Sequence, residues 1–430
     1  MKKKINVVTL GCSKNLVDSE LFLSQMVANG YEVSHDSEDS DARIVAINTC
    51  GFILDAKEES VNIILEYAVA KKRGLIDKIF VFGCLSERYR DDLIAEIPEV
   101  DGFYGKFQVR KMVEDLKADY KMSLLRQRYL TTPSHYAYLK ISEGCNRTCS
   151  YCAIPRMTGA HVSVPIEDLV SEARSLAEKG VKELLVIAQD LSFYGIDLYK
   201  KSNLAQLVSE LSDIDGIEWI KLHYAYPANF PYDLLPVMTM KHNVARYLDI
   251  ALQHCSDKML KLMRRNTTKA EIINLINRVR KEVPGIHLRT TMLVGHPGET
   301  EEDFNELKDF VRQMRFERLG VFPYSHEDDT YAGEKYEDSI PQEVKQARAD
   351  ELMDIQQQIA AKINAEKIGQ RMKVVIDRLE GDYFIGRTEF DSPEVDGEVL
   401  IAADQDFKIG NFYQVRITGS EDFDLYGELI

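Results

Sequence analysis

Six of the seven cysteines fall into two groups of three with different spacing along the chain. One group is the tight run Cys145, Cys149 and Cys152, spaced C-x3-C-x2-C. The other is Cys12, Cys50 and Cys84, and each member follows a short apolar stretch: VVTLGC, IVAINTC and IFVFGC. Thiolates are soft ligands that suit iron–sulfur clusters or zinc. Because closed structural metal sites usually take four protein ligands, two sets of three indicate open sites that do chemistry. The seventh, Cys255, has no cysteine nearby in sequence and is expected to be structural.

The fold has to bring the dispersed cysteines together. Residues 1 to about 122 alternate short apolar strands with amphipathic helices, which is typical of a parallel α/β sheet. Strands are expected at Ile5–Leu10, Ile44–Ile47 and Ile79–Phe82, and helices near Leu16–Asn29, near Leu54–Lys72 and from Ser86. The carboxyl ends of such strands share one edge, where ligand sites of open α/β sheets form. Three buried free cysteines are the alternative, since Cys is a common core residue, but three at equivalent places favour a site.

A second and longer α/β region starts at about residue 135, after a polar linker around Arg126–Ser134. Its expected strands are Tyr138–Ile141, Leu184–Ala188, Trp219–His223, Tyr247–Ala251, Leu288–Val294 and Leu319–Phe322, with helices such as Ile166–Lys179, Lys269–Glu282 and Glu299–Gln313. Six βα units are too few for a complete eight-stranded barrel. A partial (β/α)6 TIM-like barrel is therefore predicted, followed by one long helix over residues 341–367.

The tail consists of short segments rich in β-forming residues: MKVVIDRL, YFIGRTEF, GEVLIAA, FYQVRITGS and LYGELI. This pattern predicts a small antiparallel β-barrel. The expected domains of this α/β chain are therefore 1–122, 131–363 and 364–430. Residues 364–430 contain seven Lys or Arg and fifteen Asp or Glu, a net charge of −8, which is half of the chain's −16.

Composition excludes several classes of protein. The 430 residues are 45% hydrophobic and have a net charge of −16, which argues against a surface that binds nucleic acid or anionic lipid throughout. No apolar stretch reaches the roughly 18 residues of a membrane span. The N-terminal MKKKINVVTLGC resembles a lipoprotein signal, but its apolar part, Ile5–Leu10, is shorter than the ~7–15 residues required. We therefore expect a cytoplasmic chain whose cysteines bind metal rather than form disulfides.

The tight cysteine run allows two kinds of metal site. Zinc would need a fourth ligand, for which His161 is the local candidate. Alternatively, three thiolates hold three irons of a 4Fe-4S cluster and leave the fourth iron open. The C-x3-C-x2-C spacing, the aromatic Tyr151 before the last cysteine and the partial barrel resemble the radical S-adenosylmethionine (SAM) superfamily. That resemblance implies that the open iron binds SAM near Tyr151, and that the reduced cluster cleaves SAM to a 5′-deoxyadenosyl radical.

Further motifs resemble one family within that superfamily, the methylthiotransferases. They are NTCGF (48–52), FGC (82–84), AIP after Cys152, IAQDLSFYG (187–195), LQH (252–254) and TTMLVGHPGETEEDF (290–304). The family has an N-terminal three-cysteine domain, a radical SAM core and a C-terminal TRAM β-barrel. By resemblance, Cys12, Cys50 and Cys84 bind a second 4Fe-4S cluster. IAQD followed by YG, and GRTEFDSPEVDGEV in the tail, are similar to the branch that modifies an aspartate of small-subunit ribosomal protein S-twelve.

This branch implies a reaction and a set of partners. Hydrogen is abstracted from an aspartate β-carbon, sulfur is inserted from the second cluster, and another SAM supplies the methyl group. The expected partners are ribosomal protein S-twelve and a reductant protein, with no membrane, only minor RNA contact and a monomeric chain. The acidic tail is well suited to a basic ribosomal protein, although acidic surface can also merely aid solubility.

Several residues are candidates for cofactor binding. Gly295 and Gly298 lie in a strand–Gly–helix turn, where the backbone can approach a ligand and a helix N-terminus can receive a polar group. This turn follows the fifth barrel strand, where the family contacts SAM. Gln189 lies at the ligand-facing end of the second barrel strand, beside Asp190, for which helix capping is an equal alternative. Arg289 is a candidate for the SAM carboxylate, with a salt bridge as the alternative.

Two positions depart from the family pattern. Arginines that usually follow the tight run are replaced by Thr158 and Val164. If those arginines hold an anionic group, the charge must come from Arg147, Arg156 or His161.

Three other functions remain open. A tRNA adenosine methylthiotransferase uses the same core, but its TRAM barrel has to bind a polyanion, for which a tail of net charge −8 is poorly suited. A non-catalytic iron–sulfur scaffold or electron carrier would need no SAM pocket. A zinc-binding RNA module is disfavoured by the acidic charge.

Overall fold

The computed structural model describes residues 3–38, 40–404 and 407–430. Contacts within the chain define two compact units. The N-terminal unit comprises Met1–Thr132, Tyr138–Arg147 and Cys152–Val162, and the C-terminal unit comprises Pro133–Ala137, Thr148–Tyr151 and Ser163–Ile430. Cys145 and Cys152 therefore belong to the first unit, and Cys149 belongs to the second.

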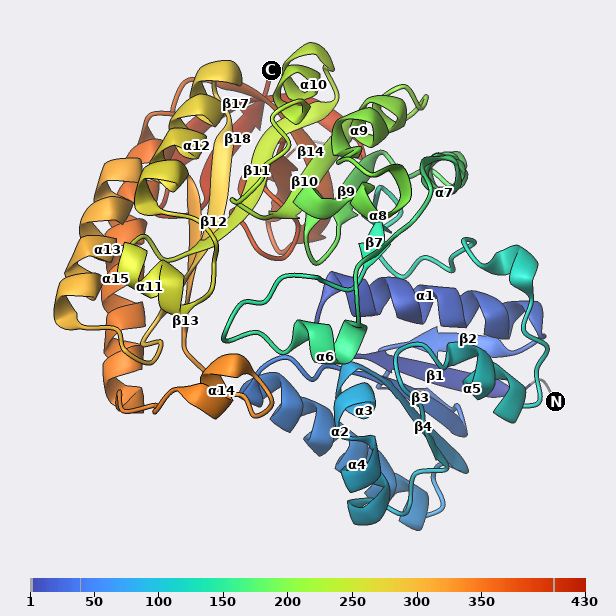
Figure 1. Ribbon diagram of the computed structural model, residues 1–430. Helices are drawn as coiled ribbons and strands as arrows, with labels where there is room; N and C mark the ends of the chain where they lie inside the picture. The colour runs from blue at the N-terminus through green and yellow to red at the C-terminus, as the bar shows by residue number, and fades with distance from the viewer. Residues whose placement is uncertain (1–2, 39, 405–406) are drawn as a thin grey trace. The chain divides into compact units, whose positions relative to one another are not determined.

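A five-stranded sheet with the order β2-β1-β3-β4-β5 forms the centre of the N-terminal unit (Figure 1). Its strands are β1 (Lys4–Thr9), β2 (Glu32–His35), β3 (Ile44–Thr49), β4 (Lys78–Gly83) and β5 (Gly102–Phe103), and all neighbours are parallel. The helices are α1 (Ser13–Ala28), α2 (Leu54–Lys72), α3 (Cys84–Arg88), α4 (Arg90–Glu96) and α5 (Val109–Asp115), followed by the 3-10 turn η1 (Met122–Leu124).

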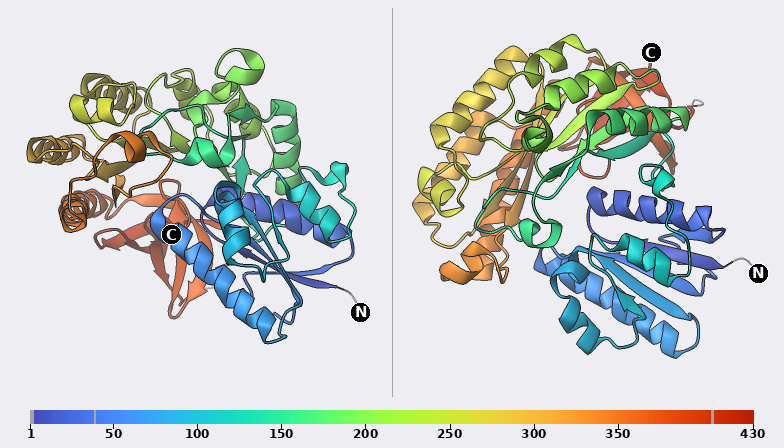
Figure 2. Two further views of the ribbon diagram at one scale, coloured as in Figure 1. Left: turned by 60° about the horizontal axis from the view of Figure 1, so that its bottom comes forward. Right: turned by 45° about the vertical axis from the view of Figure 1, so that its right-hand side comes forward.

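Helices cover both faces of this sheet, as Figure 2 shows for α1 and α2. Ile5 of β1 packs with Phe22 of α1 in one apolar cluster, whereas Val45 of β3 packs with Ile64 of α2 in another. Parallel strands buried on both faces read as continuous apolar runs. This explains why the three predicted strands are confirmed to within two residues.

The C-terminal unit contains a six-stranded sheet with the order β13-β12-β11-β10-β9-β6. The strands are β6 (Tyr136–Lys140), β9 (Glu183–Ile187), β10 (Trp219–Ala225), β11 (Val244–Gln253), β12 (His287–Val294) and β13 (Arg318–Pro323). The neighbours from β9 to β13 are parallel. This sheet confirms the predicted partial barrel of six βα units.

Four helices of this unit follow the predicted ranges closely: α7 (Ile166–Glu178), α12 (Lys269–Glu282), α13 (Glu301–Met314) and α15 (Gln342–Ala365). Two more, α9 (Leu204–Ser212) and α10 (Leu234–Met240), lie where no helix range was predicted. Shorter elements are β7 (Ser142–Glu143), α6 (Ile154–Thr158), β8 (Val162–Ser163), η2 (Leu191–Phe193), α8 (Ile196–Tyr199), α11 (Asp257–Leu262) and α14 (Tyr331–Lys335). None of the helices in the described ranges is long and apolar enough to cross a membrane.

The end of the chain forms a closed barrel with the order β14-β15-β16-β18-β17. The strands are β14 (Arg371–Glu380), β15 (Tyr383–Thr388), β16 (Val399–Ala402), β17 (Phe412–Ser420) and β18 (Leu425–Leu429). Apolar side chains such as Val374, Val399 and Val415 fill its interior. Closure leaves no unpaired strand edge. The predicted small barrel is confirmed, with one parallel pair, β16 and β18, among antiparallel ones.

The connection between β15 and β16, residues 388–396, packs against the amino-terminal halves of the core strands. Three hydrogen bonds join them: Lys221 Nζ donates to the Thr388 carbonyl (3.2 Å), Arg318 Nη2 to Asp391 Oδ1 (2.5 Å) and the Tyr247 hydroxyl to Asp396 Oδ2 (2.8 Å). In addition, the rings of His287 and Phe390 stack with their centroids 3.8 Å apart. The segment thereby closes this end of the core sheet, opposite the carboxyl edge where ligand sites of such sheets lie.

A buried ion network continues this contact between the barrel and the core. Arg387 of β15 donates two hydrogen bonds to the carboxylate of Glu183 on β9, at 3.0 and 2.8 Å, and two to Asp377 on β14, at 2.6 and 2.9 Å. Lys221 lies 2.7 Å from the same Glu183 carboxylate, and His135 lies 2.7 Å from Asp377. Burial alone would raise the pKa of Glu183, but Arg387 and Lys221 lower it to about 2.

Candidate functional site

The N-terminal sheet places Cys12, Cys50 and Cys84 at its carboxyl edge. Cys12 is the N-cap residue of α1, Cys50 directly follows β3, and Cys84 is the first residue of α3, directly after β4. The strands β1, β3 and β4 are neighbours in the sheet. The three sulfur atoms therefore come from three adjacent strand ends, as the alternation of strands and helices predicted.

Two glycines let the backbone come close to these cysteines. Gly11 has φ +93°, and a Cβ there would lie 2.6 Å from Cβ of Cys50 and 2.9 Å from its Sγ. Gly83 has φ +102°, and a Cβ there would lie 2.3 Å from Asn48 Oδ1. Larger residues would strain both turns and collide with their neighbours. The glycine in each of the VVTLGC and IFVFGC motifs thus has a local structural cause.

Polar groups beside the thiols hold the loops in place. The Cys84 thiol donates to Asn15 Oδ1 at 3.6 Å, and Asn15 Nδ2 donates to the carbonyls of Leu10 and Thr49. The Cys50 backbone N–H donates to Ser60 Oγ at 3.1 Å. These bonds connect the turns after β1 and β3 with Cys84.

Burial keeps the thiols of Cys84 and Cys50 protonated in the absence of a metal ion. Burial raises the pKa of Cys84 to about 12 and also raises the pKa of Cys50. Such thiols stay protonated until a metal ion takes the proton's place. Among the residues that the structure describes, no group of three or more His, Cys, Asp or Glu side chains is arranged to hold a single ion. A 4Fe-4S cluster binds each thiolate at a different iron, so three sulfurs spread along one edge fit a cluster.

Within the N-terminal unit, the residues that follow Cys152 pack beside Cys84. The Cys145 backbone N–H donates to the Gly159 carbonyl at 3.1 Å. Ala153 and Met157, which follow Cys152, form a small apolar cluster with Cys84. The segment that begins at Cys152 therefore lies beside Cys84.

Within the C-terminal unit, Cys149 lies beside a buried arginine that sequence reasoning missed. Arg265 Nη1 is 3.5 Å from Cys149 Sγ and 3.4 Å from the Tyr151 hydroxyl. Its guanidinium lies 4.0 Å from the ring centroid of Tyr226, whose hydroxyl is 3.9 Å from the same sulfur. Arg265 is 3% exposed, and its guanidinium places a positive charge beside the Cys149 sulfur. Arg265 belongs to none of the motifs, and no sequence signal marks it.

The glycine turn after β12 is built around Glu299. The Gly295 backbone N–H donates to Glu299 Oε2 at 2.7 Å, and Arg348 Nη1 donates to the same oxygen at 2.6 Å. The other carboxylate oxygen lies 3.1 Å from His254 Nε2. Gly295 and Gly298 have φ +72° and +89°, and a Cβ at Gly295 would meet the Lys345 side chain at 2.3 Å. Packing alone thus accounts for Gly295, and its contact with SAM stays a prediction.

A histidine next to this turn reaches the tight cysteine run. His296 Nε2 is 3.0 Å from Ser150 Oγ, and the imidazole packs edge-on against Tyr151. Burial lowers the pKa of His296 to about 4. A neutral His296 therefore connects the glycine turn to Ser150 and Tyr151, which lie between Cys149 and Cys152.

The remaining candidates lie at different positions along the strands of the core sheet: Gln189 and Asp190 follow the carboxyl end of β9, and Arg289 lies near the amino end of β12. Asp190 caps η2 by accepting a hydrogen bond from the Ser192 N–H at 2.8 Å, which is the capping alternative, and Gln189 directly precedes it. Arg289 lies in the amino-terminal half of β12 and pairs with Asp249 at 3.5 Å and Asp396 at 3.4 Å. The salt-bridge alternative for Arg289 is thus present, and its role with SAM stays a prediction.

The two positions that depart from the family pattern make local contacts. The Thr158 hydroxyl donates to the Ile154 carbonyl at 3.0 Å, and the Val164 carbonyl accepts from the Tyr194 hydroxyl at 2.7 Å. The His161 backbone N–H donates to Asn146 Oδ1 at 3.0 Å. The compensating charge at Arg147, Arg156 or His161 stays a prediction.

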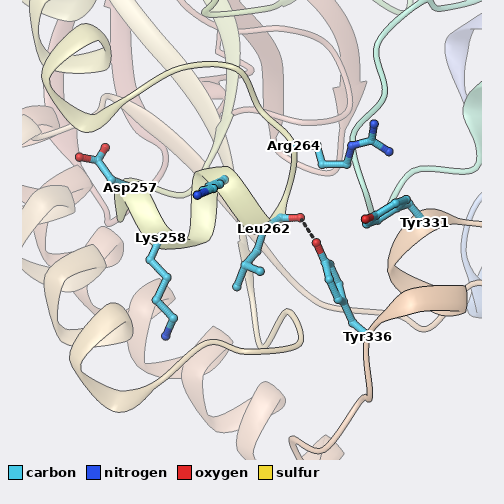
Figure 3. A pocket seen from close by; sticks show the side chains of 7 residues that line it. Asp257, Lys258, Leu262, Arg264, Tyr331 and Tyr336 are labelled. Carbon is cyan, nitrogen blue, oxygen red and sulfur yellow. Dashed lines mark hydrogen bonds between the residues drawn. The ribbon is translucent and has the colours of Figure 1, made fainter.

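A pocket of about 760 Å³ opens between α11 and α14 (Figure 3). It is lined by Asp257, Lys258, Lys261, Leu262, Arg264, Tyr331 and Tyr336. The Arg264 guanidinium lies 4.4 Å from the ring centroid of Tyr331, and the Tyr336 hydroxyl donates to the Leu262 carbonyl at 3.2 Å. Lys258 is paired with Asp303 at 2.6 Å, so Lys261 and Arg264 are the cations that make this surface suitable for an anionic group.

Comparisons with known families define the class of protein. Sequence profiles of the uncharacterized protein family UPF0004, the radical SAM superfamily and the TRAM domain match residues 4–105, 139–311 and 368–430. The fold is similar to TsrM of Kitasatospora setae, a radical SAM methyltransferase solved with cobalamin and a 4Fe-4S cluster. That similarity has a TM-score of 0.57 at 14% identity and covers 77% of this chain and 74% of that chain. The chain is a radical SAM enzyme that uses SAM and 4Fe-4S clusters.

Curated relatives define the family more narrowly. The chain is 61% identical to the ribosomal protein uS12 methylthiotransferase RimO of Bacteroides thetaiotaomicron, over 100% of this chain and 99% of the relative. It is 58% identical to RimO of Porphyromonas gingivalis ATCC 33277 (100% and 99%) and 55% identical to RimO of Cytophaga hutchinsonii (100% and 98%). The chain belongs to the RimO family of methylthiotransferases, which confirms the predicted family.

Proposed function

We propose that this enzyme adds a methylthio group to the β-carbon of an aspartate in ribosomal protein uS12. The observation that carries the proposal is the second set of cysteines at the edge of the N-terminal sheet. A radical SAM enzyme needs only one cluster to generate its radical, and a second three-thiolate site fits an enzyme that also inserts sulfur. Relatives that match this chain over its full length are uS12 methylthiotransferases.

The six cysteines divide into two roles in this proposal. Cys145, Cys149 and Cys152 hold the cluster that binds SAM, and Cys12, Cys50 and Cys84 hold the auxiliary cluster. When bound, the first cluster and SAM would supply hydrogen abstraction at the β-carbon, the auxiliary cluster the sulfur atom, and another SAM the methyl group.

The surrounding residues orient the cofactors and neutralise their charge. Arg265 keeps a positive charge at the Cys149 sulfur, where thiolate negative charge accumulates. Tyr151 and His296 pack edge-on beside that loop. Glu299 fixes the glycine turn through the Gly295 N–H, so that the turn keeps one shape when a ligand binds.

Charge supports a protein substrate. The C-terminal barrel region has a net charge of −8, which suits the basic surface expected of a ribosomal protein and repels a polyanion. The proposal includes a cytoplasmic, monomeric enzyme that takes electrons from a reductant protein.

The pocket between α11 and α14 favours a second candidate, a tRNA adenosine methylthiotransferase. Lys261 and Arg264 could contact phosphates there, and Tyr331 offers an aromatic surface. The acidic barrel argues against this substrate. The two candidates separate in one anaerobic assay that offers purified uS12 and tRNA in parallel and measures the mass of each.

A mass increase on uS12 alone is the expected result, and an increase on tRNA alone would overturn the substrate assignment. Cys145→Ala should abolish 5′-deoxyadenosine formation. Cys50→Ala should preserve it while blocking sulfur insertion. An iron–sulfur scaffold without catalysis would bind iron but release no 5′-deoxyadenosine under reductant.

A further inference from the structure

Four charged side chains form a closed ring in the N-terminal unit: Asp18, Lys106, Glu143 and Lys140. Lys106 Nζ lies 3.1 Å from Asp18 Oδ2 and 3.5 Å from Glu143 Oε1. Lys140 Nζ lies 2.8 Å from Glu143 Oε2 and donates to Asp18 Oδ1. Each carboxylate thus contacts both ammonium groups. We refer to these residues as the charge ring.

The charge ring is largely shielded from water. The side chain of Lys106 is 4% exposed, and those of Lys140, Asp18 and Glu143 are 13%, 17% and 19% exposed. Removing charges from water is costly, and apolar residues of similar size often give equal or greater stability. Stability alone therefore does not account for the charge ring. Its directional contacts instead hold α1, the segment after β5 and the strands β6 and β7 in one arrangement.

One half of the charge ring lies beside the auxiliary cysteines. Asp18 is on α1, whose N-cap residue is Cys12. Asn15, three residues earlier and so on the same helix face, accepts the hydrogen bond of the Cys84 thiol. Asp18 is thus three residues, or ~4.5 Å along the helix axis, from Asn15. Burial alone would lower the pKa of Lys106, but Asp18, Cys84 and Glu143 nearby hold it well above its usual value.

The other half lies on the segment that leads to the tight cysteine run. Lys140 ends β6, and Glu143, in β7, is two residues before Cys145. Gly144, which lies between Glu143 and Cys145, has φ +82°. A Cβ there would lie 2.1 Å from the Ala160 carbonyl oxygen. The backbone from Glu143 to Cys145 therefore follows one tightly packed path. The charge ring connects this path to α1 and to the segment after β5.

We propose that the charge ring is a positioning device that fixes the spacing between the sulfur site at Cys12 and Cys84 and the radical site at Cys145. This inference rests on the proposed function, because only an enzyme that forms a substrate radical at one site and adds sulfur held at the other needs that spacing. Asp18, Lys106, Lys140 and Glu143 act through the loops that they hold and need not touch the substrate. Misplacement by about 1 Å can cost on the order of 100-fold in rate.

The test is the double variant Lys106→Met/Asp18→Asn. It removes one cation and one anion, so the buried site keeps its neutrality, and the local pair Lys140–Glu143 remains. We expect parent-like iron content and 5′-deoxyadenosine formation. The ratio of methylthiolated uS12 to 5′-deoxyadenosine should fall on the order of 100-fold. The magnetic interaction between the two reduced clusters, measured by electron paramagnetic resonance relaxation, should weaken.

Two further variants separate positioning from general effects. Lys106→Arg retains the cation and should restore most of the product ratio. Asp77→Asn removes an exposed pair with Arg43 in the same unit and should change neither readout. An unchanged product ratio and unchanged magnetic interaction in the double variant would overturn the proposal. So would loss of iron, because the charge ring would then serve cluster assembly. If the parent fails to modify uS12, the proposed function fails, whereas the magnetic measurement still tests the spacing.

Discussion

Replacing Arg387 by Met should destabilise the C-terminal unit by about 3 kcal/mol. Removing one partner of a buried ion pair costs about 3–5 kcal/mol, because the remaining charge is left uncompensated. Here Glu183 keeps Lys221 at 2.7 Å and Asp377 keeps His135 at 2.7 Å. Neither carboxylate is fully stranded, so the lower end of the range applies.

Fluorescence offers a direct assay of this loss. Trp219, the only tryptophan, is 4% exposed and packs edge-on against Phe412 of the barrel, with ring centroids 4.7 Å apart. Its emission during urea unfolding therefore reports on the same contact between core and barrel that Arg387 stabilises. The unfolding midpoint of the variant should shift to lower urea without a change in the spectrum of the native state.

An exposed arginine in the same barrel is the matched control. Arg378 pairs with Glu380 and Glu398, but its side chain is 47% exposed. Such pairs contribute about 0–1 kcal/mol, so Arg378→Met should have a small effect. If the two variants lose equal stability, the buried network does not hold the barrel to the core.

Three other predictions concern separate parts of the molecule. Arg265→Met removes the cation beside Cys149 and should slow 5′-deoxyadenosine formation on the order of 100-fold at unchanged iron content; an unchanged rate would mean that this charge has no role. Gly83→Ala places a side chain at φ +102° against Asn48 Oδ1. It should lower the free energy of unfolding, measured in urea, by about 1–3 kcal/mol and should lower the iron content. Values equal to the parent's would contradict the strain at this turn. The lowered pKa of Glu183 means that its contribution is complete above its ordinary pKa of 4.5 and is lost as pH falls toward about 2, so unfolding free energy measured across this range should decline more in the parent than in Glu183→Gln.

The sequence predicted those parts of the fold that rest on local patterns. Helix α12 begins and ends as expected, because Thr268 and Glu271 form a capping box at its start. The strands β2 and β5 were not predicted, since EVSH is a polar edge segment and β5 has only two residues. Helix α3 begins at Cys84 rather than near Ser86, because the turn at Gly83 starts the helix at once.

The site was predictable only where residues follow a recognisable spacing or lie at equivalent ends of successive strands. Cys145, Cys149 and Cys152 have the spacing, and Cys12, Cys50 and Cys84 have the equivalent places. Arg265 and Lys106 are ordinary charged residues in sequence, and only long-range contacts bring them beside cysteines. For Arg289 the sequence allowed a salt bridge but could not name Asp396 as a partner, because the two residues lie in different predicted domains.

Residues 388–396 have a consequence for how this enzyme can be dissected. The segment supplies the carbonyl that Lys221 bonds and the carboxylate that Arg318 bonds, although both basic residues belong to the core. A chain shortened at residue 367 would expose these buried cations together with Glu183. The core therefore depends on the C-terminal barrel for the partners of its buried charges, and the two are expected to fold together.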